Sequence, residues 1–216
     1  MTAESEWVRR TACESPAERV FVGPRARLLR AGLELLFERR DTSYTIEDLV
    51  RRAGVAIKTF YRSFPNKEMF LQEVFIAIVA GAVPAVRECV LASSDDPLER
   101  LRNAVTGVLR SYDERESDDW VIANEHMRIA SVSPEAVVMA DRPFRDFLRE
   151  LVVDAAAAGQ VRPVDLDWDV AIITAMITSS FHVLALGGGE QDRDELAENV
   201  WRFCRTALRA PGRSPI

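Results

Sequence analysis

The chain has 216 residues, is 48% hydrophobic and carries a formal net charge of −6. This apolar content is enough to bury a substantial core, in one large domain or in a small one plus a medium one. The three cysteines, Cys13, Cys89 and Cys204, are widely separated and odd in number, which argues against a disulfide framework or a structural zinc site.

The sequence has no signal-peptide pattern near Met1 and no uncharged apolar run of the roughly 18–20 residues that a membrane span needs. We therefore expect a soluble, cytoplasmic protein that is not bound to a membrane. Its charge is divided: residues 1–70 carry 13 Lys and Arg against 10 Asp and Glu, and the remainder carries 15 against 24. Positive charge near the beginning permits, but does not establish, a nucleic-acid partner.

Apolar residues recur at helical spacing almost throughout, and no alternating strand pattern is present. The sequence therefore predicts an all-α fold of about nine helices. Residues 1–22 lack a clean pattern and are predicted to form a flexible arm. Its arginines (Arg9, Arg10 and Arg19) are candidates for a DNA minor groove, although the four interspersed glutamates argue against this.

Capping and breaking residues divide the rest of the chain into helices. Pro24 suits a helix start, Thr45 is a good N-cap, Gly54 is a helix stop, and Pro65 breaks the third helix. The predicted spans of the first four helices are 24–40, 45–53, 56–64 and 67–91, the last with a possible kink at Pro84. The predicted spans of the other five are 97–112, 120–131, 134–158, 167–186 and 194–210.

Residues 45–64, TIEDLVRRAGVAIKTFYRSF, are typical of a helix-turn-helix. The first helix has an apolar face (Ile46, Leu49 and Val50), and Gly54 can adopt the positive φ of a tight turn. Phe60 is expected to bury the second helix against the first. An ordinary helical hairpin would share these features, but the exposed Tyr-Arg pair and the Pro-Asn-Lys-Glu stop favour DNA binding.

The second helix should expose a surface of short, polar or basic side chains suited to a major groove. These residues are Ala56, Ile57, Lys58, Thr59, Tyr61, Arg62 and Ser63. Lys58 and Arg62 are separated by four residues and lie on one helix face. Both could recognise guanine, or both could bind phosphates, and the sequence leaves these two possibilities open.

The segment AGVAIKTFYRSFPNKE at 53–68 resembles the DNA-binding domain of the TetR/AcrR regulators, and the resemblance extends from about Arg25 to Phe75. It implies a helix-turn-helix DNA-binding domain at 23–70 and a helical ligand-sensing and dimerisation domain at 71–216. The sequence departs from the family pattern twice, because Ala56 replaces a common serine and Ser63 replaces a frequent histidine.

The resemblance also implies roles for individual residues. Thr45 would cap the second helix and contact a phosphate, Tyr61 would place its hydroxyl on the DNA backbone, and Lys67 would clamp another phosphate. The remaining DNA-facing candidates are Ala56, Ile57, Lys58, Thr59 and Arg62, on base edges or flanking phosphates.

Apolar and aromatic residues with a few polar groups in the middle helices predict a small-molecule pocket, although they also describe ordinary core. The candidates are Trp120, Asn124, His126, Met127, Phe144, Phe147, Trp168, Met176 and His182. The two histidines can be core residues, polar anchors for a ligand, or metal ligands with Glu125. Without a third well-placed ligand, a metal site is the weakest of these, and we expect no metal and no cofactor.

Residues 168–186, WDVAIITAMITSSFHVLAL, are apolar nearly all round, so this helix must be covered on more than one side. The resemblance implies that the last two helices pair with those of a second copy in a four-helix bundle. Such a two-fold dimer would bind a palindromic operator in double-stranded DNA.

These features together predict a repressor that is released from its operator by a small hydrophobic effector. A helical enzyme is a poor hypothesis, since the sequence has none of the nucleophile, phosphate-loop or zinc-protease motifs, and we expect no catalytic residues. Two further hypotheses stay open: a regulator that senses oxidants through Cys89 or Cys204, and a DNA-binding regulator without an effector.

Overall fold

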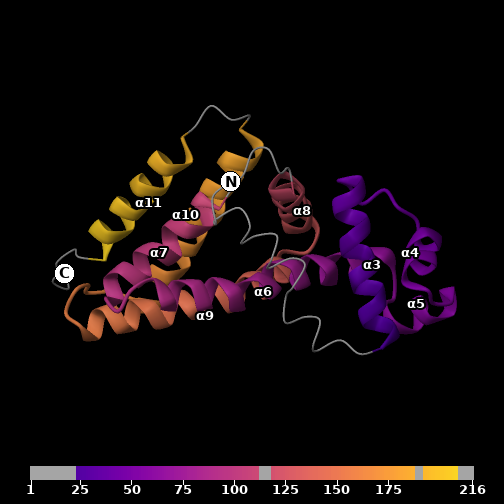
Figure 1. Cartoon of the computed structure of the whole chain (residues 1–216), viewed down its shortest axis with the longest axis horizontal. Helices are drawn as coiled ribbons and strands as arrows, with labels where there is room; N and C mark the ends of the chain where they lie inside the picture. Colours follow the sequence, from indigo (N-terminus) through magenta and orange to yellow (C-terminus); the bar gives the residue numbers. More distant parts are fainter. Residues whose placement is uncertain (1–22, 112–117, 188–191, 209–216) are drawn as a thin grey trace. The chain divides into compact units, whose positions relative to one another are not determined.

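The computed structural model describes residues 23–111, 118–187 and 192–208. The predicted arm, with its three arginines and Cys13, lies outside the described residues. Within them the chain forms nine α-helices and no strand, which confirms the all-α prediction (Figure 1). The helices are α3 (Pro24–Arg39), α4 (Ile46–Ala53), α5 (Ile57–Ser63), α6 (Lys67–Ser93), α7 (Pro97–Arg110), α8 (Asp118–Val132), α9 (Pro134–Ala157), α10 (Leu166–Leu186) and α11 (Arg193–Ala207).

The helix ends follow the predicted capping signals closely. Thr45 accepts a hydrogen bond from the Asp48 backbone N–H at 3.0 Å, and the Asp48 carboxylate accepts one from the Thr45 N–H at 3.2 Å. This reciprocal capping box satisfies two backbone donors that the first turn of α4 would otherwise leave without partners. At the other end Gly54 has φ +61°, the left-handed conformation expected at the turn.

The helices form two compact units, which are described separately. The head unit contains described residues 23–82 and 118–141, and therefore α3, α4, α5, α8, the first part of α6 and the start of α9. The body unit contains described residues 83–111, 142–187 and 192–208. The head unit thus includes α8, which lies far from α3–α5 in the sequence.

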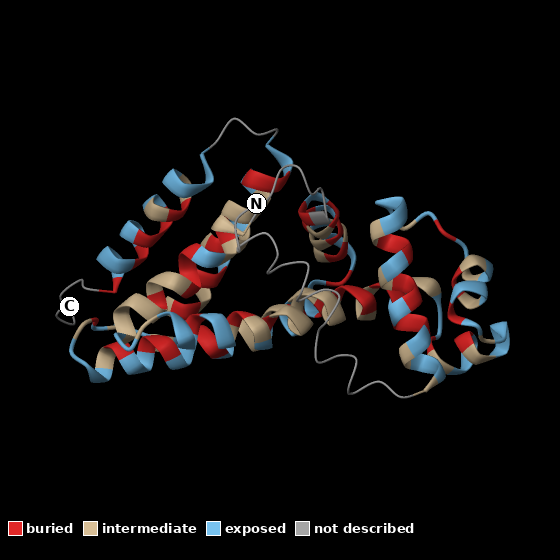
Figure 2. Ribbon diagram, viewed as in Figure 1, coloured by how far each residue is buried: buried red, intermediate tan, exposed pale blue. Residues whose placement is uncertain are grey.

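Aromatic rings fill the centre of the head unit. Figure 2 shows buried residues in red along the helices of this unit. The ring centroid of Phe60 lies 5.6 Å from that of Phe64 and 5.7 Å from that of Phe70, and the Phe64 and Phe70 centroids are 5.0 Å apart. Leu28 of α3 and Leu49 of α4 are fully buried in the same cluster. These contacts join α3, α4 and α5 to the first turn of α6 and hold them as one rigid piece.

The packing of α3 on α6 depends on a glycine. A Cβ atom at Gly32 would lie 2.9 Å from Cε1 of Phe70 and 3.0 Å from a methyl group of Val74. Because these distances are shorter than van der Waals contact, α3 can approach α6 this closely only where it has no side chain.

In the body unit α7 packs against both α10 and α11, and α10 packs against α11. Charged side chains reinforce the contact between α7 and α11. Glu198 accepts hydrogen bonds from Arg102 at 2.8 Å and from Arg110 at 2.5 Å, and Arg110 also reaches Asp194 at 3.1 Å. Burial opposes the charge of Glu198, but the two arginines hold its pKa below the usual value.

Two helices of the described residues, α6 and α10, are long and apolar enough to cross a membrane by length and composition alone. Both contribute buried side chains to the units described above: Phe70 and Val74 of α6 in the head unit, and Val170 and Ile173 of α10 in the body unit. Core helices of soluble proteins have the same length and composition.

Candidate functional site

The second helix of the predicted helix-turn-helix, α5, is buried on one side and exposed on the other. Phe60 on its inner side is fully buried in the head core. On its outer side Ile57, Lys58, Tyr61 and Arg62 are exposed. This arrangement confirms the predicted burial of Phe60. The exposed residues form an apolar pair, Ile57 and Tyr61, beside a basic pair, Lys58 and Arg62, and the members of each pair are four residues apart.

The two cations of α5 are not neutralised within the described part of the chain, where neither Lys58 nor Arg62 takes part in a hydrogen bond or an ion pair. Several other arginines of the head unit are paired, among them Arg52, which contacts Glu38 at 2.5 Å, and Arg51, which contacts Asp48 at 3.1 Å. The positive charge of α5 therefore stays available to an anionic partner such as a phosphate backbone.

The exposed apolar residues of α5 do not belong to the core. Ile57 is absent from the side chains that pack against the head core, among which are Ile46, Val50 and Val55. The ring of Tyr61 stands edge-on to that of Phe60 at a centroid distance of 5.3 Å, which restrains its direction. Both side chains are therefore held at the surface by the helix without being needed to fill the interior.

Two residues predicted to be exposed are half-buried instead. Thr59 and Ser63 lie one turn apart, beside the buried face of α5, and the Ser63 hydroxyl donates a hydrogen bond to the Thr59 carbonyl at 3.0 Å. The helical period of 3.6 residues places both of them at the edge of the side that Phe60 occupies. Their access to a partner is consequently smaller than that of Lys58 and Arg62.

Lys67, at the first position of α6, is directed toward the connection between α3 and α4. Its ammonium group donates hydrogen bonds to the carbonyl oxygens of Tyr44 and, at 2.5 Å, of Thr42, and it lies 4.8 Å from the centroid of the Tyr44 ring. Burial lowers the pKa of Lys67. The predicted phosphate contact of this residue stays a prediction, and it would have to compete with these two carbonyls.

The sequence interpretation missed a group of charged residues that joins α6 to α8. The Arg128 guanidinium donates to both carboxylate oxygens of Glu68, at 3.0 and 2.9 Å, and to the buried Glu125 carboxylate at 2.9 Å. Burial disfavours the charge of Arg128, but the two carboxylates outweigh this effect and raise its pKa. Only the three-residue spacing of Glu125 and Arg128 could have suggested part of this group from the sequence.

Four of the predicted pocket residues lie on α8 in the head unit. Trp120, Asn124 and Met127 are exposed, whereas His126 is half-buried and stands edge-on to Phe75 at a centroid distance of 5.7 Å. Burial lowers the pKa of His126, so the ring is neutral at pH 7. Phe75 itself belongs to a small apolar cluster with Ile129, Ala136 and Ala140.

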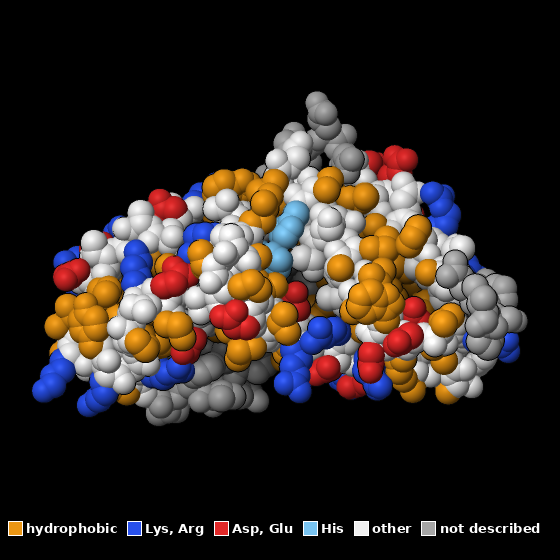
Figure 3. Space-filling model, turned by 180° about the vertical axis from the view of Figure 1, so that it is seen from behind, with side chains coloured by type: hydrophobic (Ala, Val, Ile, Leu, Met, Phe, Trp, Pro, Cys, Tyr) orange, Lys and Arg blue, Asp and Glu red, His pale blue; other side chains and the backbone are white. Residues whose placement is uncertain are grey.

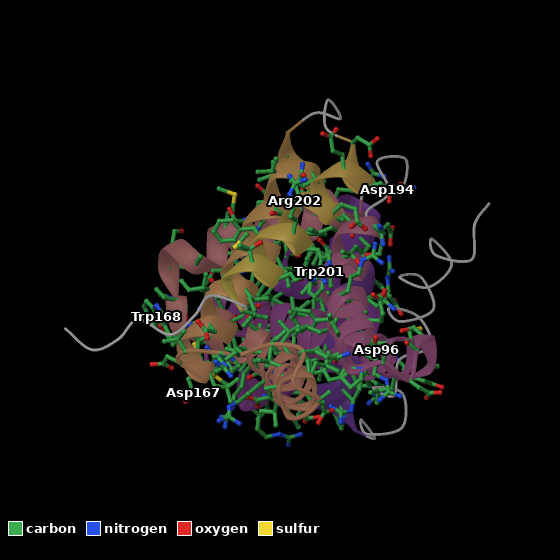
Figure 4. All side chains as sticks on the ribbon, turned by 90° about the vertical axis from the view of Figure 1, so that its left-hand side faces the viewer. Asp96, Asp167, Trp168, Asp194, Trp201 and Arg202 are labelled. Carbon is green, nitrogen blue, oxygen red and sulfur yellow. The ribbon has the colours of Figure 1, made fainter. Side chains whose placement is uncertain are left out.

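The other predicted pocket residues lie in the body unit. Phe147 is buried, with the Arg87 guanidinium 4.9 Å from its ring centroid, and Phe144, Met176 and His182 are half-buried. Trp168 is exposed at the outside of the unit, in contrast to Trp201 among the helices (Figure 4). The role of these residues in an effector pocket stays a prediction.

The described residues hold no cluster of three His, Cys, Asp or Glu side chains that could bind a metal ion. Of the two cysteines within them, Cys89 is exposed and Cys204 is buried. Burial raises the pKa of the Cys204 thiol to about 11. At neutral pH Cys204 therefore has very little of the thiolate that reacts with oxidants.

Two family models match the chain. Residues 28–74 match the model described as bacterial regulatory proteins of the tetR family, and residues 94–208 match a tetracyclin repressor-like C-terminal domain. The first covers the helix-turn-helix with α3 and the start of α6, and the second covers the region from the end of α6 to α11. No curated protein matches the chain.

Solved structures share the fold at low sequence identity. FadR from Thermus thermophilus in complex with lauroyl-CoA matches with a TM-score of 0.67 and 22% identity, over 88% of this chain and 98% of that one. RolR in complex with resorcinol matches with a TM-score of 0.64 and 21% identity, over 92% and 97%. FadR from Bacillus subtilis in complex with stearoyl-CoA matches with a TM-score of 0.59 and 15% identity, over 85% and 98%.

The C-terminal model alone spans more than half of the 216 residues, and the N-terminal model spans α4, α5 and the aromatic cluster that positions α5. The chain therefore belongs to the TetR family of DNA-binding transcriptional regulators, which are not enzymes.

Proposed function

We propose that this protein is a repressor that binds a palindromic operator as a homodimer and is released by a small hydrophobic effector. The observation that carries the proposal is the outer face of α5, where the cations Lys58 and Arg62 have no ion-pair partner among the described residues and lie beside Ile57 and Tyr61. A rigid helix with a free basic and apolar surface suits the major groove, where basic side chains recognise guanine and apolar ones contact the thymine methyl group.

The proposed dimer forms through α10 and α11. Exposed small and apolar residues follow one another along one side of α10, and α11 adds an exposed phenylalanine. These residues are Trp168, Ile172, Ala175, Ser179, Val183, Leu186 and Phe203. Figure 3 shows hydrophobic side chains gathered on the surface over the body unit. A second copy of the chain is the proposed occupant, since an isologous contact would cover the same stripe on both copies.

The proposed effector is hydrophobic. Structures of similar fold contain resorcinol in RolR, stearoyl-CoA in one FadR protein and lauroyl-CoA in another. In the body unit the half-buried residues among the predicted lining, Phe144, Met176 and His182, are the ones we retain for the effector. Trp168 suits the subunit interface better than an enclosed pocket, because most of its side chain is exposed.

Selection of operator DNA from random duplexes by the full-length protein tests the proposal directly. We expect a palindromic consensus whose half-sites are about one turn of DNA, or slightly more, apart. The selected duplex is then titrated with the protein in a gel-shift or fluorescence-anisotropy assay at a fixed salt concentration. Enrichment of no sequence, or equal affinity for selected and scrambled duplexes, would overturn the assignment of α5 as a sequence-reading helix.

Effector release is tested on the complex with the selected operator, using lauroyl-CoA, stearoyl-CoA and resorcinol as probes. A probe that releases DNA must also bind more weakly to the protein–operator complex than to the free protein, by the same factor. Operator binding that none of a broad panel of acyl and aromatic compounds changes would favour a regulator without an effector. Cys204 does not support the oxidant-sensing hypothesis, because its thiol is buried.

Ile57 is expected to read a thymine methyl group. Replacing thymine by uracil removes only that methyl, so each dT in the selected operator can be tested by itself. At one position in each half-site the exchange should weaken binding of the wild-type protein by about 1 kcal/mol, the size of a lost apolar contact of this kind. Fluorescence anisotropy with each substituted duplex measures the change.

The matched variant is Ile57→Ala, which does not touch the core because Ile57 lies outside it. This variant should lose the preference for thymine over uracil at that same position and keep its dependence on every other position. If Ile57→Ala discriminates thymine from uracil as well as the wild type does, the contact belongs to another residue.

A further inference from the structure

The helix α8 is part of the core of the head unit. Its residue Val121 is buried in the same cluster as Leu28, Phe60 and Phe70, which hold the helix-turn-helix together. The helices α3 and α8 also lie in direct contact. Although α8 follows the first three helices by more than fifty residues in the sequence, the DNA-reading helix is therefore packed on a scaffold that includes it.

Polar contacts continue from α8 toward the first helix of the helix-turn-helix. Arg128 holds the Glu68 carboxylate by two hydrogen bonds, and Glu68 follows directly on Lys67 in the first turn of α6. Lys67 in turn holds the backbone carbonyls of Thr42 and Tyr44. Thr45, the next residue, is the N-cap of α4. An unbroken series of contacts thus joins Arg128 to the start of α4.

The direction of Arg128 is itself fixed. Its Nε donates to Glu125, a buried carboxylate one turn earlier on α8, and this contact leaves Nη1 facing Glu68. A guanidinium held by two carboxylates has a defined plane, and it transmits the position of its helix more accurately than a flexible ammonium group would.

We propose that Arg128 is a positioning residue for DNA binding: by holding Glu68 it sets the orientation in which α4 and α5 are presented to the operator. The inference deepens the proposed function, on which it rests.

Glu68→Ala tests the proposal with the least disturbance. It removes the partner on α6 and leaves the Arg128–Glu125 pair intact, whereas a variant that removes Arg128 would leave a buried carboxylate without its counter-charge. We expect affinity for the selected operator to fall about tenfold, within the usual range of coupling between a remote contact and a binding site. Affinity for a scrambled duplex should stay within about twofold, since phosphate contacts dominate it.

The matched control is Glu198→Ala in the body unit. Its side chain is 41% exposed, close to the 42% of Glu68, and it also joins two helices through arginine. This variant should leave the ratio of operator affinity to scrambled-duplex affinity unchanged. Equal losses in the two variants, or a loss in Glu68→Ala that is the same for both duplexes, would show that Glu68 contributes general stability only and would overturn the proposal.

Two more variants, Arg128→Lys and the double variant Glu68→Ala/Arg128→Lys, complete a double-mutant cycle with Glu68→Ala and the wild type. If Arg128 acts through Glu68, the double variant binds operator no more weakly than the weaker of the two single variants. If the fold-losses in operator affinity of the two single variants multiply in the double variant, the two residues act independently, and this result would contradict the inference. A wild-type protein that selects no operator would instead refute the proposed function, so the two failures can be told apart.

Discussion

Phe60→Ala is expected to destabilise the head unit by about 3–5 kcal/mol, the usual cost of removing a fully buried phenylalanine side chain. Phe60 is 0% exposed, and its ring meets those of Phe64 and Phe70. The loss should therefore separate α5 from the first turn of α6. Chemical denaturation followed by circular dichroism measures the change, and hydrogen exchange should become faster over residues 45–64.

The adjacent residue supplies the control for this variant. Tyr61 is 56% exposed and makes one edge-to-face ring contact, so Tyr61→Ala should change the free energy of unfolding by no more than about 1.5 kcal/mol. It should nevertheless weaken DNA binding, because the side chain lies on the outer face of α5. Similar destabilisation by the two variants would contradict the division of α5 into a buried and a reading face.

Trp168→Glu is expected to convert the proposed dimer into a monomer and to weaken operator binding by a factor of about 10² or more, the contribution of joining two binding modules. Trp168 is 67% exposed at the first turn of α10. A carboxylate there would be buried without a counter-charge in the proposed two-fold interface. Sedimentation velocity measures the mass, and fluorescence anisotropy measures operator affinity.

Met139→Glu provides the matched surface change. Met139 is 60% exposed on α9 and belongs to the head unit, so it is not part of the stripe on α10. It should leave both the mass and the operator affinity as they are in the wild type. A monomeric Met139→Glu, or a dimeric Trp168→Glu, would mean that the subunits associate through a different surface.

Local signals in the sequence predicted most of the fold. Thr45, Gly54 and Pro97 mark helix ends because caps, left-handed turns and first-turn prolines depend on a few neighbouring residues. All nine predicted helices are present among the described residues, with ends displaced by no more than a few positions. The burial of Phe60 was predictable for the same reason, since helical periodicity alone places it opposite Lys58 and Arg62.

Contacts between distant segments were not predictable in this way. Nothing in the pattern of α8 indicates that Val121 enters the core around Phe60, or that Arg128 meets Glu68, because periodicity identifies an apolar face without identifying its partner. The direction of Lys67 was missed for a related reason. Its position suits a phosphate contact, but the carbonyls that hold it become neighbours only when the connection between α3 and α4 folds back.

The separation of core and surface on α5 has a consequence for how operator preference can change. The side chains at 57, 58 and 62 are exposed, and none belongs to the buried core of the head, so new combinations at these three positions should fold about as well as the parent. A library randomised there is expected to retain the parental melting temperature in most members while recognising different DNA sequences. The preference for an operator sequence can therefore change by substitutions at these positions without further mutations that restore the stability of the head unit.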